Sequence, residues 1–137
     1  MSEASNVERF NPPGMAFPGM SQAVGCGDLV LVSGQVALKD RQIVCAGDPA
    51  GQAEQVFRNI EAVLAEAGLT LGHVVSLRCF LTSPDAYQAY ASVKNRIFAG
   101  HPPAASAMVV TALVMPEILV EVEAVAWRHA LAKTGAV

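Results

Sequence analysis

The strongest constraint on the fold is the segment 48–68, DPAGQAEQVFRNIEAVLAEAG, which carries the start and stop signals of a helix. Asp48 can cap its start, Pro49 suits the first turn, and Gly68 can end it in a left-handed conformation. Its apolar residues recur three and four positions apart and form one stripe, made of Ala53, Val56, Phe57, Ile60, Val63, Leu64 and Ala67. A helix with one apolar stripe must pack against another layer of structure.

A second helix is predicted within residues 83–100, where Ser83 can cap the start, Pro84 follows it, and Gly100 closes the segment. The remaining apolar runs have the composition or the two-residue alternation of strands. They lie at residues 28–36, 73–81, about 104–113 and about 119–128. This order of strands, helix, strand, helix and strands predicts an α+β fold with both helices on one face of a sheet.

Side-chain parity predicts the faces of two of these strands. In residues 73–81 the expected apolar face consists of Val75, Leu77, Cys79 and Leu81, with Ser76, Arg78 and Phe80 opposite. In the last strand, small aliphatic residues at even positions suit helix packing, whereas the odd positions are Leu119, Glu121, Glu123, Val125 and Trp127. Two carboxylates on such a face fit either a partly buried subunit interface or a solvated pair.

Composition limits the classes of partner. With 137 residues and no shift in composition, the chain is read as a single domain, 1–137. It is 53% hydrophobic but only 15% charged, so we expect part of its apolar surface to be buried against another copy. A net charge of −3 with scattered basic residues argues against nucleic acid. The absence of a signal peptide or membrane-length apolar run predicts a cytoplasmic protein without a membrane partner.

The three cysteines, Cys26, Cys45 and Cys79, have no CxxC spacing and no histidine partner at a ligand spacing. Neither a disulfide framework nor a metal site is therefore predicted, and we interpret the cysteines as small buried hydrophobic residues. Cys26 is expected nearest to a surface turn because glycines flank it.

Several segments, in their order and spacing, resemble the RidA/YjgF family, also called the L-PSP or Rid proteins. They are AFPGMSQAV, LVLVSGQV, QAEQVFRNIEAVLAEAGL, VVSLRCFL, PAAS and VEVEAVA, and they span nearly the whole chain. The resemblance implies a chorismate-mutase-like α+β fold and a homotrimer whose sheets form an inner barrel. It also implies a small-molecule ligand in each cleft between subunits, with no metal or organic cofactor.

Active members of this family hydrolyse reactive imines and enamines to a 2-oxo acid and ammonia. This chemistry needs a cation for the substrate carboxylate, a positioned water, and a group that manages protons. In the family the cation is the arginine of a P-A-R-S/T motif, which binds a carboxylate through a planar fork of donors. Here the motif is Pro103-Ala104-Ala105-Ser106, so Ala105 stands at the arginine position and Ser106 is retained.

A second departure lies in the N-terminal loop, where the family's G-P-Y becomes Pro18-Gly19-Met20, and Met20 takes the tyrosine position. Glu123 matches the family's cleft glutamate, and Ser33 and Gly34 match its S-G-Q segment. By this resemblance Glu123 and Ser33 are the candidate catalytic residues. Gly34, Met20, Ala105, Ser106 and Arg78 are the candidate binding residues. We expect a deaminase-like hydrolase with an altered substrate.

Three alternatives stay open. Arg78 can supply the missing cation or form an ion pair with Glu121 or Glu123. His101 can act as a proton shuttle or interact with the preceding helix end. The protein can also be a non-catalytic trimer that binds a metabolite or acts as a regulatory or chaperone-like partner. Endoribonuclease activity, suggested by the L-PSP name alone, is disfavoured by the acidic charge and the lack of a basic patch.

Overall fold

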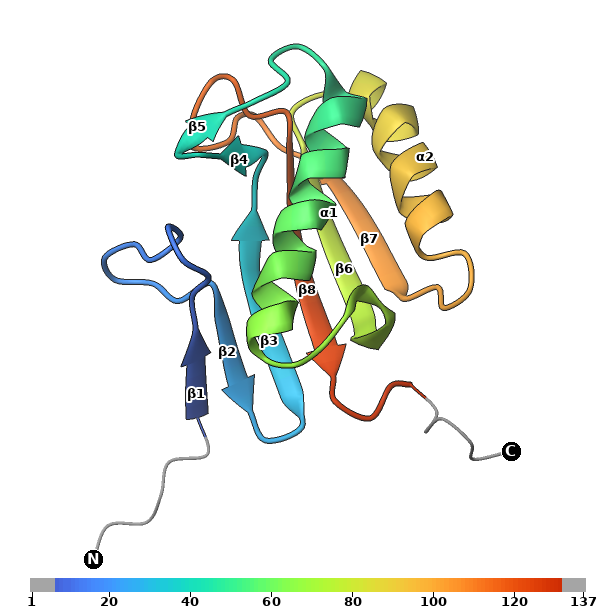
Figure 1. Ribbon diagram of the computed structural model, residues 1–137. Helices are drawn as coiled ribbons and strands as arrows, with labels where there is room; N and C mark the ends of the chain where they lie inside the picture. The colour runs from blue at the N-terminus through green and yellow to red at the C-terminus, as the bar shows by residue number, and fades with distance from the viewer. Residues whose placement is uncertain (1–6, 132–137) are drawn as a thin grey trace, which may run out of the picture.

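The computed structural model describes residues 7–131, in which a six-stranded sheet carries two helices on one face (Figure 1). No helix in this range is long and apolar enough to cross a lipid bilayer. The helices are α1, Pro49–Glu66, and α2, Tyr87–Ile97, and 3-10 turns at Leu71–His73 and Pro84–Ala86 precede β6 and α2. The strands are β1 (Val7–Phe10), β2 (Ala23–Cys26), β3 (Leu29–Gln35), β4 (Leu38–Lys39), β5 (Gln42–Ile43), β6 (Val74–Leu81), β7 (Ala104–Val109) and β8 (Val120–Trp127).

The strand order in the sheet is β1-β2-β3-β8-β6-β7, and β4 and β5 form a separate small ribbon. All neighbouring pairs are antiparallel except β6 and β7, which are parallel and are connected through α2. Strand β8, the last in the chain, therefore lies in the middle of the sheet between β3 and β6. The edge strand β7 and the β1–β2 pair lie at opposite ends of the same sheet.

Helix α1 begins and ends through the residues that the sequence predicts. The Asp48 carboxylate accepts a hydrogen bond from the backbone N–H of Gly51 at 3.0 Å, and Gly68 follows the helix with a φ of 74°. The predicted stripe packs on the sheet, and Ala53, Val56, Ile60, Val63 and Leu64 are fully buried. Opposite them, the even positions of β8 are buried as predicted, and they are Val120, Val122, Ala124 and Ala126.

The second helix begins through a 3-10 turn. The Ser83 hydroxyl accepts a hydrogen bond from the backbone N–H of Asp85, and the turn leads directly into α2. The Phe57 ring joins the two helices, because it stacks on Tyr90 and meets Phe98 edge to face. These contacts fix the position of α2 over β6 and β7, the end of the sheet where the P-A-A-S segment lies.

A buried glutamine fixes the start of β8. The Gln52 side chain of α1 has no exposed surface, and its Nε2 donates to the carbonyl oxygens of Glu117 and Val44. Its Oε1 accepts the backbone N–H of Leu119 at 2.8 Å. Because a buried amide must find partners for both ends, these bonds hold the chain at the entry to β8 in one register.

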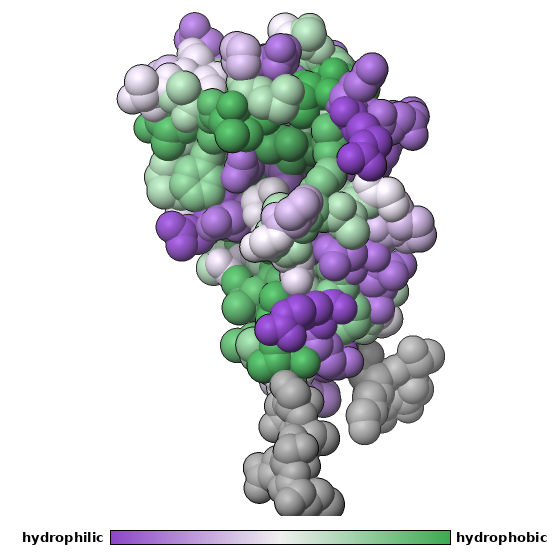
Figure 2. All heavy atoms as spheres, turned by 90° about the vertical axis from the view of Figure 1, so that its left-hand side faces the viewer, coloured by the Kyte–Doolittle hydropathy of each residue, from purple (hydrophilic) through white to green (hydrophobic). Residues whose placement is uncertain are grey.

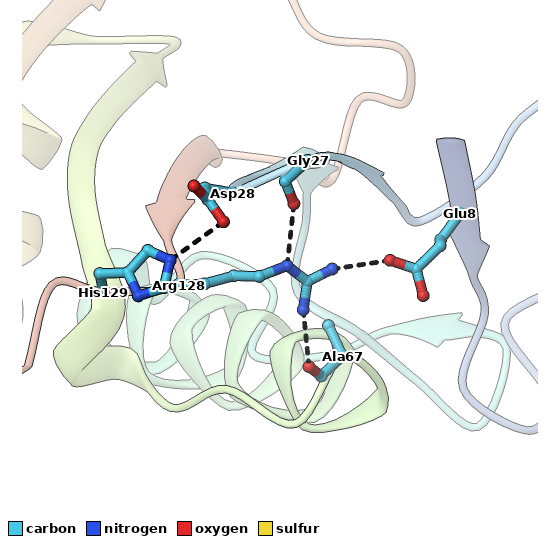
Figure 3. Close-up of polar contacts among 6 residues, drawn as sticks. All are labelled: Glu8, Gly27, Asp28, Ala67, Arg128 and His129. Atoms are coloured by element: carbon cyan, nitrogen blue, oxygen red, sulfur yellow. Dashed lines mark hydrogen bonds and ion pairs between the residues drawn. The ribbon is translucent and has the colours of Figure 1, made fainter. Parts of the chain in front are cut away.

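Arg128, directly after β8, joins three segments that are far apart in sequence (Figure 3). Its guanidinium donates to the Gly27 carbonyl at 3.0 Å, to the Ala67 carbonyl at 3.3 Å and to the Glu8 carboxylate at 2.9 Å. His129 beside it pairs with Asp28 at 3.0 Å. The contacts link the β1–β2 end of the sheet to the C-terminal end of α1.

The face of the sheet opposite the helices, called the open face here, is covered by no element of the described chain (Figure 1). Leu29, Leu31 and Trp127 on this face each expose more than 40% of their surface. A second apolar area lies at the end of the molecule that carries β4, β5 and the loop after β7 (Figure 2). Val114 of that loop is 85% exposed. One copy of the chain thus leaves extended apolar surface in water.

Three sequence-based expectations were wrong in detail. Val75 does not share the buried face of β6, because a register shift between Val74 and Ser76 places Val74 inside and leaves Val75 exposed. The strand expected at 104–113 ends at Val109. The cysteines were interpreted as buried, but only Cys79 is, because Cys26 and Cys45 are exposed. Cys26 does lie beside a surface turn, as its flanking glycines predicted.

Candidate functional site

The candidate catalytic residue Glu123 lies in a cleft on the open face. Arg78 pairs with it across β6 and β8, with Nε and Oε1 3.7 Å apart. The cleft has a volume of about 220 Å³, and its lining residues are Leu31, Val32, Ser76, Arg78, Glu123, Ala124 and Val125. Both partners of the ion pair are well exposed, so the pair adds little stability and can open for a ligand.

Ser33 and Gly34 lie at the irregular end of β3, where the register against β8 shifts between Val32 and Gln35. The Ser33 hydroxyl donates to the carbonyl oxygen of Ser21 at 2.6 Å, which leaves its oxygen free to accept a hydrogen bond. Gly34 lies directly against the Glu121 carboxylate, and a methyl group at this position would overlap it. The absence of a side chain at Gly34 therefore gives this carboxylate its place.

Glu121, two residues before Glu123 on the same face, has an altered acidity. Burial beside Gly34 raises its pKa, and the nearby negative charge of Glu123 raises it further. A carboxyl group with a raised pKa can carry a proton closer to neutral pH than an ordinary glutamate. Glu121 was not among the candidate site residues, although its parity with Glu123 was visible in the sequence.

Met20 lies in the loop between β1 and β2, after a turn in which Gly19 has a φ of 77°. Its backbone N–H donates to the Phe17 carbonyl, and its side chain is 42% exposed. The loop is held near β3 by a buried pair, because Gln35 Nε2 donates to Gln22 Oε1 at 2.7 Å. Met20 therefore belongs to the β2–β3 side of the molecule.

Ala105 and Ser106 lie at the other end of the sheet, on edge strand β7, where Ala104 to Ala107 are all exposed. Ala105 pairs with buried Leu77 and so faces α2, whereas Ser106 pairs with Arg78 and faces the open side. Two clefts adjoin Ala105. The larger, called the Lys94 cleft here, has a volume of about 260 Å³ and is lined by Lys94, Asn95, Phe98, Ala99, Pro102, Pro103 and Ala105.

The smaller cleft, of about 40 Å³, adjoins the same two residues, Lys94 and Ala105, from the side of Tyr87 and Tyr90. Beneath it, burial raises the pKa of the Cys79 thiol to about 12, against a hydrogen bond from Tyr90 and the positive charge of Lys94, which lower it. Burial also raises the pKa of the Tyr90 phenol. These two groups stay protonated at neutral pH and serve as a fixed polar floor.

His101 follows α2, and its backbone N–H donates to the Phe98 carbonyl. Its ring meets Phe98 edge to face, and the buried Nδ1 has no hydrogen-bond partner within residues 7–131. The ring lines a shallow depression with Pro102 and Pro103. His101 thus lies beside the Pro-Pro segment and not beside Glu123.

Within one chain these residues form two separate groups. The larger group lies on or near the open face and consists of Glu123, Arg78, Ser33, Gly34 and Ser106. Ala105 instead faces α2 on edge strand β7, and Met20 lies in the loop between β1 and β2. No group of three His, Cys, Asp or Glu side chains among residues 7–131 could hold a metal ion. One copy cannot surround a small ligand with both groups.

The comparisons with known proteins decide the family. The family model described as Endoribonuclease L-PSP matches residues 15–128. The chain belongs to the RidA/YjgF family. It is 32% identical over 133 residues to the 2-iminobutanoate/2-iminopropanoate deaminase of Salmonella typhimurium, covering 92% of this chain and 99% of the relative.

Two further relatives extend this family likeness. Protein DfrA of Myxococcus xanthus is 40% identical over 96 residues, which is 68% of this chain and 73% of DfrA. The crystal structure of Rv2704, a YjgF/YER057c/UK114-family protein of Mycobacterium tuberculosis, superposes with a TM-score of 0.75 at 35% identity. That match covers 86% of this chain and 97% of the other. The RidA/YjgF fold inferred from the sequence is thus confirmed.

Lys94 was missed as a site residue by sequence reasoning. The signal was present, because Lys94 lies four residues after Tyr90 and hence on the same side of α2 as the residues packed against the sheet. A lysine among the packed residues of a helix is uncommon, and its presence there suggests a specific role. Motif comparison did not supply one, because the family's cation belongs to the P-A-R-S segment and not to this helix.

Proposed function

We propose that this RidA/YjgF-family protein is a homotrimeric hydrolase of imines or enamines, with a substrate preference altered by Ala105. The observation that carries the proposal is the Glu123 carboxylate, which lies beside Arg78 in a cleft on the open face. Two relatives named 2-iminobutanoate/2-iminopropanoate deaminase align over almost the whole chain. The retained Glu123, Ser33 and Gly34 are the residues expected to handle water.

The complete site is proposed to form between copies. The open-face group lies on β3, β8 and β6, whereas Ala105 on the edge strand β7 faces α2, on the other side of the sheet. A cyclic arrangement can bring the open face of one copy against the β7 edge of the next. Such an arrangement also covers Leu29, Leu31 and Trp127, whose exposure is costly in a single copy. The ligand would then lie in a cleft at the subunit interface.

The reaction is addition of water to a carbon–nitrogen double bond. Glu123 accepts a proton as the water oxygen bonds to the imine carbon, and the proton is then delivered to nitrogen. The tetrahedral carbinolamine loses ammonia as the C=O bond forms, so imine and water give a carbonyl compound and ammonia. The Ser33 oxygen, whose hydroxyl proton is held by Ser21, is suited to accept a hydrogen bond from the water.

Ala105 weakens the binding of small 2-imino acids in this scheme. Loss of a charge-assisted contact to a carboxylate typically costs about 1.5–3 kcal/mol, which corresponds to a roughly ten- to hundredfold loss in kcat/KM. Arg78, the cation considered from the sequence, stands beside Glu123 on the open face and is engaged with it. We therefore assign Arg78 to the water-handling side and not to carboxylate binding beside Ala105.

The test is hydrolysis of freshly generated 2-iminopropanoate, followed as 2-oxo acid formed above the uncatalysed rate. We expect slow turnover by the natural chain, an increase of about tenfold or more in kcat/KM for Ala105→Arg, and loss of turnover for Glu123→Gln. If neither the natural chain nor Ala105→Arg accelerates hydrolysis, the hydrolase proposal fails.

A second candidate is a non-catalytic trimer that binds a metabolite or a regulatory partner. It is favoured by Ala105 and by the Arg78–Glu123 ion pair, which occupies the carboxylate needed for catalysis. In that case Glu123→Gln changes the stability of the protein but leaves ligand binding intact.

A further inference from the structure

A cation without a counter-ion lies beside the position of the missing arginine. Within residues 7–131, Arg78, Arg96 and Arg128 each pair with a glutamate. No carboxylate in this range pairs with Lys94, nor with four other basic residues, but of these five only Lys94 lies beside Ala105. Lys94 is half-buried between α2 and the mouth of β7. An anionic ligand in the cleft would give this ammonium group a partner of opposite charge.

The position of Lys94 suits contact with a ligand at Ala105. Lys94 and Ala105 line both clefts at the mouth of β7, the larger on the Pro102–Pro103 side and the smaller on the tyrosine side. The charge of Lys94 also acts on Cys79, which lies in β6 directly beside Ala107 of β7. Lys94 therefore lies close enough to the strand for its charge to act on a group within the sheet.

The bareness of the strand mouth makes room for this contact. Ala104, Ala105, Ser106 and Ala107 are all exposed and have short side chains, so nothing on β7 fills the space in front of Lys94. A long side chain at Ala105 would occupy the Lys94 cleft itself. The short side chain at Ala105 therefore leaves the space that a ligand needs to reach Lys94.

The lining of the Lys94 cleft specifies a class of ligand. Lys94 and Asn95 supply donors at one side, while Phe98, Pro102 and Pro103 supply an apolar wall. Such a lining suits a carboxylate that carries an apolar body. A lysine binds as a point charge, without the forked geometry of an arginine, so the ligand can tilt to accommodate a larger substituent.

We propose that Lys94 binds the ligand carboxylate in place of the arginine absent at Ala105, and that the ligand is a small carboxylate with a branched or aromatic apolar substituent. The inference rests on the proposed function of this cleft. It also revises the substrate, from small 2-imino acids to 2-imino acids with bulky apolar side chains.

Binding of 4-methyl-2-oxopentanoate, a product of such a substrate, tests the inference by calorimetry on the full-length protein. Its methyl ester, which lacks the charge, is the matched neutral probe. We expect Lys94→Met to weaken carboxylate binding roughly ten- to hundredfold and to leave ester binding unchanged. Lys94→Arg should retain most of the affinity, and Lys39→Met, which removes an exposed lysine from β4, should change nothing.

The inference is overturned if Lys94→Met and the natural chain bind the carboxylate equally, or if the natural chain does not prefer the carboxylate to the ester. Lys94→Gln is a second variant that removes the charge, and it must elute at the same mass as the natural chain in size exclusion. Weakened binding by this variant then cannot be due to a folding defect. Failure of this inference can be distinguished from failure of the proposed hydrolase activity. If Lys94→Met weakens binding while no imine is hydrolysed, the anion site stands and catalysis fails. If imines are hydrolysed with an unchanged KM in Lys94→Met, the Lys94 assignment alone fails.

Discussion

At the residue scale, Gly34 and Glu121 show how a backbone position sets the chemistry of a side chain. The carboxylate lies where a side chain of residue 34 would lie, and the resulting burial raises its pKa above the ordinary value of 4.5. The negative charge of Glu123, two residues away on the same face, raises the pKa of Glu121 further. The folded protein therefore binds a proton at Glu121 more tightly than the unfolded chain does.

This imbalance predicts a pH dependence of stability. When the folded pKa is raised, the stability present below the unfolded pKa is lost as pH rises through the folded pKa. Glu121→Gln should remove that loss, so the variant should have a higher urea midpoint than the natural chain at about pH 7.5 and an equal one at about pH 4. Glu61→Gln on the exposed side of α1 is the control. Equal midpoints of Glu121→Gln and the natural chain at both pH values would contradict the prediction.

Site residues differed in how far the sequence could identify them. Ala105, Met20 and Glu123 were assigned by alignment with motifs, which gives positions along the chain but not the faces on which they lie. The structure adds that Ala105 faces α2, and it confirms the face that strand parity predicted for Glu123. Lys94 could not be recognised in this way, because its significance depends on a cleft formed by two elements that only packing brings together.

At the element scale, α1 could be predicted almost completely and β6 only in part. The ends of α1 depend on local capping chemistry at Asp48 and Gly68, which sequence patterns record. The face of Val75 depends instead on a shift in pairing with β8, to which the sequence of β6 gives no clue. The same reasoning covers β7, because its pairing with β6 stops at Val109 although the apolar run continues.

Arg128 gives a prediction about how the elements are joined. Arg128→Met should lower the free energy of unfolding by about 1–2 kcal/mol, because it removes charge-assisted hydrogen bonds that are only partly shielded from water. Hydrogen exchange should quicken most in β1 and β2, whose attachment depends on the bonds to Glu8 and Gly27 (Figure 3). Arg58→Met, on the exposed side of α1, is the matched control. A uniform change in exchange across the sheet would argue against a role in holding β1 and β2.

At the scale of the whole molecule, the low charge of the chain and the uncovered face of its sheet have one explanation. A chain with 53% hydrophobic and only 15% charged residues cannot cover both faces of a six-stranded sheet with two short helices. Leu29 and Leu31, from the apolar run 28–36, and Trp127 are left exposed on the open face. The proposed association of copies would account for both observations, and in the proposed trimer it would also supply the second half of the site.

Disrupting the open face should therefore abolish assembly and ligand binding together. In Leu31→Glu, a charge is placed at the centre of that face, between Val24 on β2 and Val125 on β8, where burial against another copy would leave it unpaired. We expect light scattering after gel filtration to give the mass of three chains for the natural protein and of one chain for Leu31→Glu. Ala62→Glu, which adds the same charge to the exposed side of α1, should remain a trimer. Because Ala105 and Glu123 are predicted to meet only across subunits, the monomeric variant should also lose imine turnover although both residues are intact. Turnover by a monomer would show that one copy of the chain is sufficient for the site.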